Sequence, residues 1–451
     1  PPNTHTCPVC LGLPGTLPVI NRRAVEHVLA TGVAIGAETP AATRWDRKNY
    51  FYPDLPKGYQ ISQYDLPLAA HGRLTIQTSE GEVTIGITRA HLEEDTAKLV
   101  HGTDAAGRRV SLIDFNRSGA PLMEIVTDPE VRSAEQARRY AEELQALLRA
   151  IGASDADMER GQMRVEANVS LRPRGTEAFG TRVEVKNMNS FRAVERAIAF
   201  EIERQAAALD AGETLTQDTR GWNEDRGITY VMRSKEDSHD YRYFPEPDLP
   251  PLRVDAAWLA ALRDALPELP AARRARYERD LGLSGYDAGV IVGEPRATEL
   301  FEGARAAAPD ADPKALANWV TGAYLGLLKT DPEAAARVSP AELADLVRRV
   351  GAGELSGTNA KEVFAAHAAD GATVASIVDA RGFRQISDTS ALGAVIDEVI
   401  AANPKAVEDY RAGKPVLGFF VGQVMKATRG QANAALVQTA VRDRLEGGSG
   451  T

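Results

Sequence analysis

The chain has 451 residues, of which 43% are hydrophobic and 26% charged, and its net charge at pH 7 is −10. A chain of this length usually folds into about two to four domains. No apolar run approaches the roughly 20 residues that span a bilayer, which excludes a protein with membrane-spanning helices. The acidic balance excludes a protein that coats nucleic acid with its whole surface, so any such contact must be a local basic patch.

The two cysteines of the chain, Cys7 and Cys10, are separated by two residues near its start. Two cysteines exclude a disulfide framework and favour a reducing compartment. A Cys-x-x-Cys pair supplies half of a tetrahedral zinc site. A redox pair and an inert pair are the alternatives, although no thioredoxin-like strand-helix pattern surrounds these residues. We therefore expect a zinc half-site at this position.

Aromatic and basic residues are interleaved between residues 46 and 64. This stretch holds five tyrosine or phenylalanine rings in a chain that is 6% aromatic, together with Arg47, Lys48 and Lys57. Bases stack on rings and phosphates pair with Lys and Arg. The pattern favours nucleotide binding, and the alternative is an aromatic loop packed on a core.

Residues 91–98 carry three adjacent acids between His91 and Lys98. In an extended strand His91 and Glu93 point to one face and Glu94 points to the other, apolar face. A carboxylate on an apolar face needs a cation or hydrogen bonds. Mg²⁺, which binds through one or two carboxylates and substrate phosphates, would satisfy Glu94. The alternative is a solvated run of charges.

A further acid, Glu124, lies inside the apolar stretch 121–126. A lone carboxylate in an otherwise buried strand needs a partner, and one metal ion shared by Glu94 and Glu124 is the economical explanation. The sequence has no Walker A motif, which excludes a P-loop ATPase, and no dinucleotide fingerprint, nucleophile elbow or zincin motif.

Strand and helix patterns alternate up to residue 252. Residues 73–88 alternate on either side of Glu80-Gly81, which predicts a hairpin, and Ser133 begins a capping box for a helix that ends at Gly152. Residues 160–192 contain two alternating strands, with seven cations and three acids in all. This segment is a candidate basic patch, and a solvated strand face is the alternative.

Four prolines between residues 241 and 252 predict a domain boundary. Beyond it Ala, Leu, Arg and Glu recur at helical period, which predicts an all-α domain over 253–382. Three amphipathic segments then predict a small helical tail domain over 383–446, in which Lys426 and Arg429 flank a turn and are candidate phosphate contacts. The expected fold class is α+β, with a mixed α/β domain over 1–252.

Together these segments resemble the B subunits of bacterial aspartyl/glutamyl-tRNA amidotransferases, which implies that Lys426 and Arg429 contact tRNA. The resemblance is carried by residues 7–15, 46–64, 87–95, 111–126, 184–191, 232–251 and 416–433. It implies a cradle-like catalytic domain, a helical domain and a tail that holds tRNA. It also implies a cytoplasmic heterotrimer with an amidase (glutaminase) A subunit and a small C subunit.

The resemblance implies an activity as well. The protein would bind tRNA(Gln) mischarged with Glu or tRNA(Asn) mischarged with Asp, phosphorylate the side-chain carboxylate with ATP and Mg²⁺, and let ammonia displace the phosphate. Glu94 and Glu124 match the metal-binding acids of the family, with Glu93 and His91 beside them as catalytic candidates. In the family a Glu-Val-His-Val segment and another cysteine pair come earlier, so we expect the catalytic domain to be incomplete at its N-terminus.

The implied chemistry is physically reasonable, because a carboxylate does not react with ammonia at neutral pH without a leaving group. Phosphoryl transfer requires positioning and cations at the phosphates. The cofactor-binding candidates are Lys98, Arg47, Lys48 and Lys57. Two other classes remain open: a non-catalytic tRNA-binding adaptor and a zinc-ribbon nucleic-acid-binding module.

Overall fold

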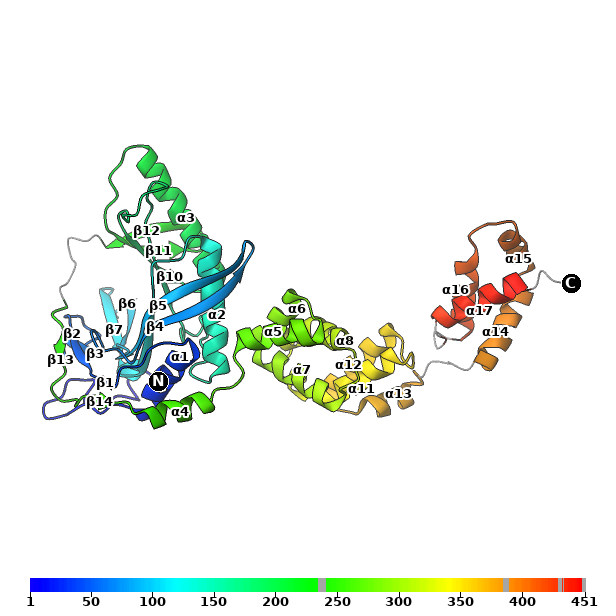
Figure 1. Ribbon diagram of the computed structural model, residues 1–451, viewed down its shortest axis with the longest axis horizontal. Helices are drawn as coiled ribbons and strands as arrows, with labels where there is room; N and C mark the ends of the chain where they lie inside the picture. Colours follow the sequence, from blue (N-terminus) through cyan, green and yellow to red (C-terminus); the bar gives the residue numbers. More distant parts are fainter. Residues whose placement is uncertain (234–240, 384–388, 429–431, 433, 448–451) are drawn as a thin grey trace. The chain divides into compact units, whose positions relative to one another are not determined.

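The computed structural model describes residues 1–233, 241–383, 389–428, 432 and 434–447. Two units, Pro1–Pro270 and Ala271–Thr451, each form their own internal contacts. Helices account for 46% of the chain and strands for 19%, and the described strands lie in the first unit (Figure 1). The mixed fold class, with a sheet-rich N-terminal part and a helical C-terminal part, is confirmed.

The elements of the first unit are α1 (Arg22–Ala34), β1 (Ala42–Thr43), β2 (Asp46–Asn49), β3 (Tyr59–Ser62), β4 (Ala69–Thr78), β5 (Gly81–Glu94), β6 (Lys98–Thr103), β7 (Arg109–Asp114), η1 (Phe115–Arg117), β8 (Pro121–Thr127), α2 (Ala134–Ala150), β9 (Val165–Val169), β10 (Val183–Met188), α3 (Phe191–Asp210), β11 (Thr219–Asn223), β12 (Ile228–Arg233), β13 (Phe244–Pro245), β14 (Leu252–Arg253) and α4 (Ala256–Asp264).

The sheet that carries the acidic residues has the order β4-β5-β8 and is antiparallel throughout. The predicted hairpin is present as β4 and β5, which meet at Gly81 with a φ of 116° that favours glycine. One face of this sheet packs on α1 through Leu29 and Ala90. The predicted helix is present as α2, capped by Ser133, and its Leu144 packs against Ile87 of β5.

A second sheet has the order β12-β11-β10-β9, and α3 packs on it through Val194 and Val185. Burial alternates along β9 and β10 as the sequence predicted. On the polar side Lys186 forms ion pairs with Glu166 at 3.0 Å and with Glu184 at 3.5 Å. These pairs neutralise part of the candidate basic patch.

A third, small sheet has the order β13-β2-β3 and brings residues far apart in sequence together. Phe244 of β13 pairs with Arg47 of β2, and Asp46 of β2 pairs with Ser62 of β3. The aromatic stretch 46–64 therefore lies beside the proline-rich segment 241–251.

The first unit ends later than the boundary predicted at residue 252. Helix α4 lies beside α1 (Figure 1), and its Trp258, Leu259 and Leu262 join the core that α1 forms with β5. Helical periodicity shows that this segment has an apolar face, but not which core buries that face.

The second unit is helical. Its elements are α5 (Pro270–Leu281), α6 (Gly285–Gly293), α7 (Pro295–Ala307), α8 (Pro313–Asn318), the π-helix η3 (Trp319–Tyr324), α9 (Leu325–Thr330), α10 (Pro332–Arg337), α11 (Pro340–Gly351), α12 (Gly357–Asp370), α13 (Val374–Arg381), α14 (Thr389–Ala402), α15 (Pro404–Arg411), α16 (Leu417–Ala427) and α17 (Ala434–Gly447). None of the described helices in either unit is both long and apolar enough to cross a bilayer.

The buried apolar residues of the second unit form two separate clusters. One runs from Tyr277 to Val378, and the other includes Ile396, Phe420 and Val437 of the tail. The three amphipathic segments predicted for the tail are the helices α14, α16 and α17. The short α15 between them was not predicted.

Candidate functional site

Pairing of β5 with β8 places two of the predicted acids and a histidine together. His91 lies directly opposite Glu124, and Glu93 lies two residues further along the same face of β5. His91, Glu93 and Glu124 each offer a ligand atom, and these three atoms lie within 4.8 Å of one another. The side chains of His91 and Glu93 are buried, and that of Glu124 is half-buried.

Glu93 is held in its charged form by its neighbours. Burial alone would raise the pKa of this carboxyl, but nearby His91, the charge of Lys48 and the hydroxyl of Ser62 together lower the pKa below its usual range. Ser62 Oγ donates to Glu93 at 3.2 Å, and Lys48 Nζ lies 4.0 Å away. A buried charged carboxylate with so few direct hydrogen bonds is suited to binding a cation.

His91 supplies the second indication of a cation site. The residue is 3% exposed, and its Nδ1 is buried with no hydrogen-bond partner among the described residues. Such an unsatisfied atom costs about 1–3 kcal/mol unless a ligand uses it. Two carboxylates and an imidazole with a free nitrogen form a suitable donor set for a divalent cation.

The structure separates Glu94 from this cluster, which corrects the expectation that Glu94 and Glu124 share one ion. Because strand residues alternate, Glu94 points to the opposite face of β5 from Glu93. Its carboxylate forms an ion pair with Lys57 and accepts from the backbone N–H of Ile61 at 2.9 Å. The partner that its buried position required is therefore a lysine.

The four predicted phosphate-binding cations have different surroundings. Of these four, Lys48 lies at the acidic cluster. Arg47 binds Glu246 through two hydrogen bonds of 2.7 and 2.8 Å, and Lys57 pairs with Glu94. Lys98 is exposed at the start of β6, opposite Asp114. Arg47 and Lys57 are thus already paired with carboxylates of the chain. Lys48 is therefore the predicted cation best placed to contact a substrate.

Three tyrosines stand beside the cluster: Tyr64 belongs to the aromatic stretch predicted to bind a nucleotide, whereas Tyr241 and Tyr243 were not predicted. The rings of Tyr64 and Tyr243 are stacked, with centroids 4.4 Å apart, and Lys48 Nζ lies 5.1 Å from the ring centroid of Tyr241. Burial raises the pKa of the Tyr243 phenol, and the charges of Glu93 and Glu124 raise it further. A local sequence pattern could not find Tyr241 and Tyr243, because the β2–β13 pairing that brings them here spans nearly 200 residues.

The cysteine pair forms a tight turn in which the two thiols differ. Cys7 is exposed and Cys10 is buried. The backbone N–H of Cys10 is the main cause that lowers the pKa of Cys7, whereas burial raises the pKa of Cys10 to about 11. Two sulfurs fit half of a zinc site, and the described residues bring no third ligand to them.

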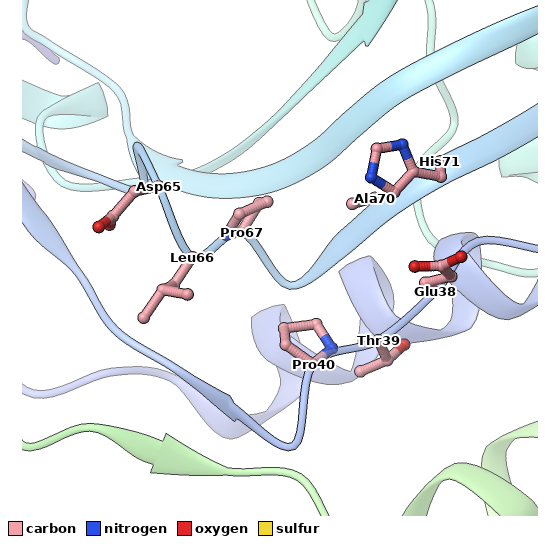
Figure 2. A pocket seen from close by; sticks show the side chains of 8 residues that line it. All are labelled: Glu38, Thr39, Pro40, Asp65, Leu66, Pro67, Ala70 and His71. Atoms are coloured by element: carbon pink, nitrogen blue, oxygen red, sulfur yellow. The ribbon is translucent and has the colours of Figure 1, made fainter.

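A hollow of about 220 Å³ lies elsewhere in the first unit and contains none of the predicted site residues. Figure 2 shows the side chains around it, among them the polar groups of Glu38, Asp65 and His71. The acidic cluster is instead a partly buried surface formed by paired strands.

Comparison with known proteins identifies the family. Residues 1–260 match the family model described as the GatB/GatE catalytic domain, and residues 299–445 match the one described as the GatB domain. The chain belongs to the GatB family. The resemblance found from its sequence segments is confirmed.

Three relatives are each named as the B subunit of an aspartyl/glutamyl-tRNA(Asn/Gln) amidotransferase. The protein of Moorella thermoacetica is 54% identical over 448 residues, which cover 98% of this chain and 93% of the relative. That of Thermosynechococcus vestitus is 50% identical, covering 100% and 91%, and that of Carboxydothermus hydrogenoformans is 48% identical, covering 98% and 92%. Similarity to the GatB family thus extends over almost the whole chain.

The GatB domain match includes the tail and its predicted tRNA contacts. Lys426 is exposed in the last turn of α16. Arg429 lies outside the described residues. The exposed position of Lys426 is compatible with a phosphate contact, which stays a prediction.

Proposed function

We propose that this chain is the tRNA-binding, carboxylate-activating B subunit of a glutamine-dependent amidotransferase that works in the cytoplasm. Its substrates would be Glu on tRNA(Gln), Asp on tRNA(Asn), or both. The observation that carries the proposal is the His91–Glu93–Glu124 cluster on paired strands of a GatB-family catalytic domain.

The reaction would proceed in two steps. A side-chain carboxylate oxygen of the aminoacyl group attacks the γ-phosphorus of ATP, and ADP leaves. Ammonia then attacks the carbonyl carbon, phosphate leaves, and the nitrogen loses a proton to form the amide. A glutaminase A subunit would supply the ammonia, and a small C subunit would complete the heterotrimer.

His91, Glu93 and Glu124 would hold Mg²⁺, which when bound supplies positive charge to the nucleotide phosphates. The lowered pKa of Glu93 keeps its carboxylate charged at neutral pH, and the half-buried Glu124 stays open to the surface. Lys48 adds an ammonium beside Glu93. His91 Nε2 lies 3.8 Å from the Glu93 carboxylate, so the imidazole is next to the acid with which it would share the ion.

The aromatic residues next to the cluster would bind a base. Tyr64 is 58% exposed although its ring stacks on Tyr243, so more than half of its surface stays accessible to a ligand. Stacking on such a ring contributes about 1–3 kcal/mol per base and tolerates any base. Either ATP or the 3′ end of the tRNA could provide it.

An amidation assay tests the proposed function. The chain would be assembled with its A and C partners and given ATP, Mg²⁺, glutamine, and each of the two mischarged tRNAs in turn. We expect conversion of at least one mischarged tRNA to its amidated form, together with ATP cleavage that requires that tRNA. Amidation without such cleavage, or ATP cleavage that persists in a complex lacking this chain, would instead identify a tRNA-holding adaptor.

A further inference from the structure

The face of β5 that carries His91 and Glu93 holds one more cation, Arg89, which was not predicted from the sequence. Arg89 stands two residues before His91, about 7 Å away along the strand. The register between β5 and β8 shifts just before Arg89. From Arg89, which lies opposite Val126, the pairing is regular to the end of β5. Arg89, His91 and Glu93 therefore form one row on the same face of the strand.

Among the described residues, no side chain forms a hydrogen bond or an ion pair with the guanidinium of Arg89. Its Nε is buried without a hydrogen-bond partner in the described part of the chain, and no ion pair joins Arg89 to a described carboxylate. Arg89 is half-buried, and its buried Nε has lost contact with water without gaining a hydrogen bond among the described residues, which is costly for a polar N–H. Arg47, by contrast, is fully engaged by Glu246. An anion from outside the chain would satisfy Arg89.

Tyr243 shows that Arg89 and the acids face a common region. Burial raises the pKa of its phenol, Glu93 and Glu124 raise it further, and the charge of Arg89 opposes them. The phenol is thus near all three side chains. An anion held by Arg89 would lie next to the acidic cluster and near the stacked rings of Tyr64 and Tyr243.

The proposed reaction has two anionic substrate groups, the ATP phosphates and the side-chain carboxylate of the aminoacyl group. The cluster and Lys48 are suited to serve the phosphates, which leaves the carboxylate without a partner. A guanidinium presents two parallel N–H donors that match a planar carboxylate. We propose that Arg89 binds the side-chain carboxylate of the aminoacyl group and positions it beside the His91–Glu93–Glu124 cluster, an inference that rests on the proposed function.

The test compares charged and uncharged tRNA, because only the charged form carries the carboxylate. In the assembled complex, dissociation constants would be measured for both forms and for a non-hydrolysable ATP analogue. Arg89→Gln should weaken binding of charged tRNA roughly ten- to hundred-fold, the range of a charge-assisted hydrogen bond. Binding of uncharged tRNA and of the ATP analogue should stay unchanged. Arg89→Lys should give an intermediate loss, since it keeps the charge and loses the paired donors.

Arg279→Gln is the matched control, because this arginine of α5 is exposed and pairs with the neighbouring Asp280. It should leave all three constants unchanged. Equal loss of both tRNA forms, a loss of ATP-analogue binding, or an unaltered preference for charged tRNA in Arg89→Gln would overturn the assignment. If Arg89→Gln fails to fold, the same outcomes in Arg89→Lys decide.

The two proposals fail differently. A wild-type complex that cleaves no ATP in response to charged tRNA contradicts the proposed function. A wild-type complex that is active, with an Arg89 variant of normal substrate preference, contradicts only the role of Arg89.

Discussion

Two adjacent glutamates show how a single step along a strand changes the role of a side chain. Glu93 belongs to the acidic cluster, whereas Glu94 pairs with Lys57, whose side chain is 5% exposed. Removing one partner of such a buried pair leaves the other charge unpaired, at a cost of roughly 3–5 kcal/mol. We therefore predict that Glu94→Gln lowers the free energy of unfolding by about that amount in denaturant titrations.

The double variant Lys57→Met/Glu94→Gln is the control for that prediction, because it leaves no buried charge. It should recover most of the lost stability. A Glu94→Gln protein of normal stability with abolished ATP cleavage would show instead that Glu94 acts at the reaction centre.

The cysteines allow a second test on individual side chains. Alkylating reagents attack thiolates, so the thiol with the lower pKa reacts first. The pKa of Cys7 is lowered, and that of the buried Cys10 is raised to about 11. In metal-free protein at mildly alkaline pH, mass spectrometry should find iodoacetamide on Cys7 well before Cys10, and bound zinc should protect both. Equal labelling rates would contradict this difference.

At the site, sequence reasoning identified the strand and its acids but paired Glu94 with Glu124. Alternation along β5 was predictable, because it needs only the period of a strand. That Lys57 neutralises Glu94 was not, since the contact joins residues 37 positions apart. Arg89 went unnoticed for the same reason: only the folded chain shows that its buried Nε has no hydrogen-bond partner among the described residues.

The loop between η1 and β8 lies between the cysteine turn and the end of β5, close to both. Gly119 has a φ of 77°, and a Cβ added there would lie 2.2 Å from Cys10 Sγ. Gly119→Ala should therefore destabilise the unit through both backbone strain, about 1–2 kcal/mol, and displacement of Cys10. Denaturant titration should show the loss, and the displaced Cys10 should react faster with iodoacetamide.

Gly107→Ala separates the two causes. Gly107 has the same φ of 77° but nothing within 4 Å of an added Cβ. It should show the strain alone and leave the reactivity of Cys10 unaltered. Equal effects of the two substitutions would mean that the contact with Cys10 contributes nothing.

Elements with a strong local signal were predictable. The β4–β5 hairpin and α2 follow from alternation, turn glycine and capping serine. The core against which α4 packs was not predictable, because α4 packs against α1, which lies more than 200 residues earlier. The short α15 begins at Pro404 and carries a largely polar sequence, so its periodicity is weak.

The tail has its own hydrophobic core and follows the catalytic domain in the sequence. Removing residues 383–451 should raise KM for charged tRNA and leave amidation at saturating substrate near normal, since Lys and Arg contacts to phosphate act on affinity. Glutaminase activity should not change. Lys426→Glu should give the same effect in smaller measure, and its difference from the wild type should shrink as the salt concentration rises. Unchanged tRNA affinity in the truncated complex would assign the tRNA contact to another part of the chain.

The variant Glu124→Gln shows whether the His91–Glu93–Glu124 cluster activates the carboxylate. This change keeps the size of the half-buried side chain and removes one charge from the group of three ligand atoms. In the assembled complex we predict that ATP cleavage stimulated by charged tRNA falls by about 10²-fold or more, as when a key electrostatic contact is lost, while glutaminase activity and thermal stability stay normal. Cleavage at the wild-type rate in Glu124→Gln would place the activation site elsewhere in the chain.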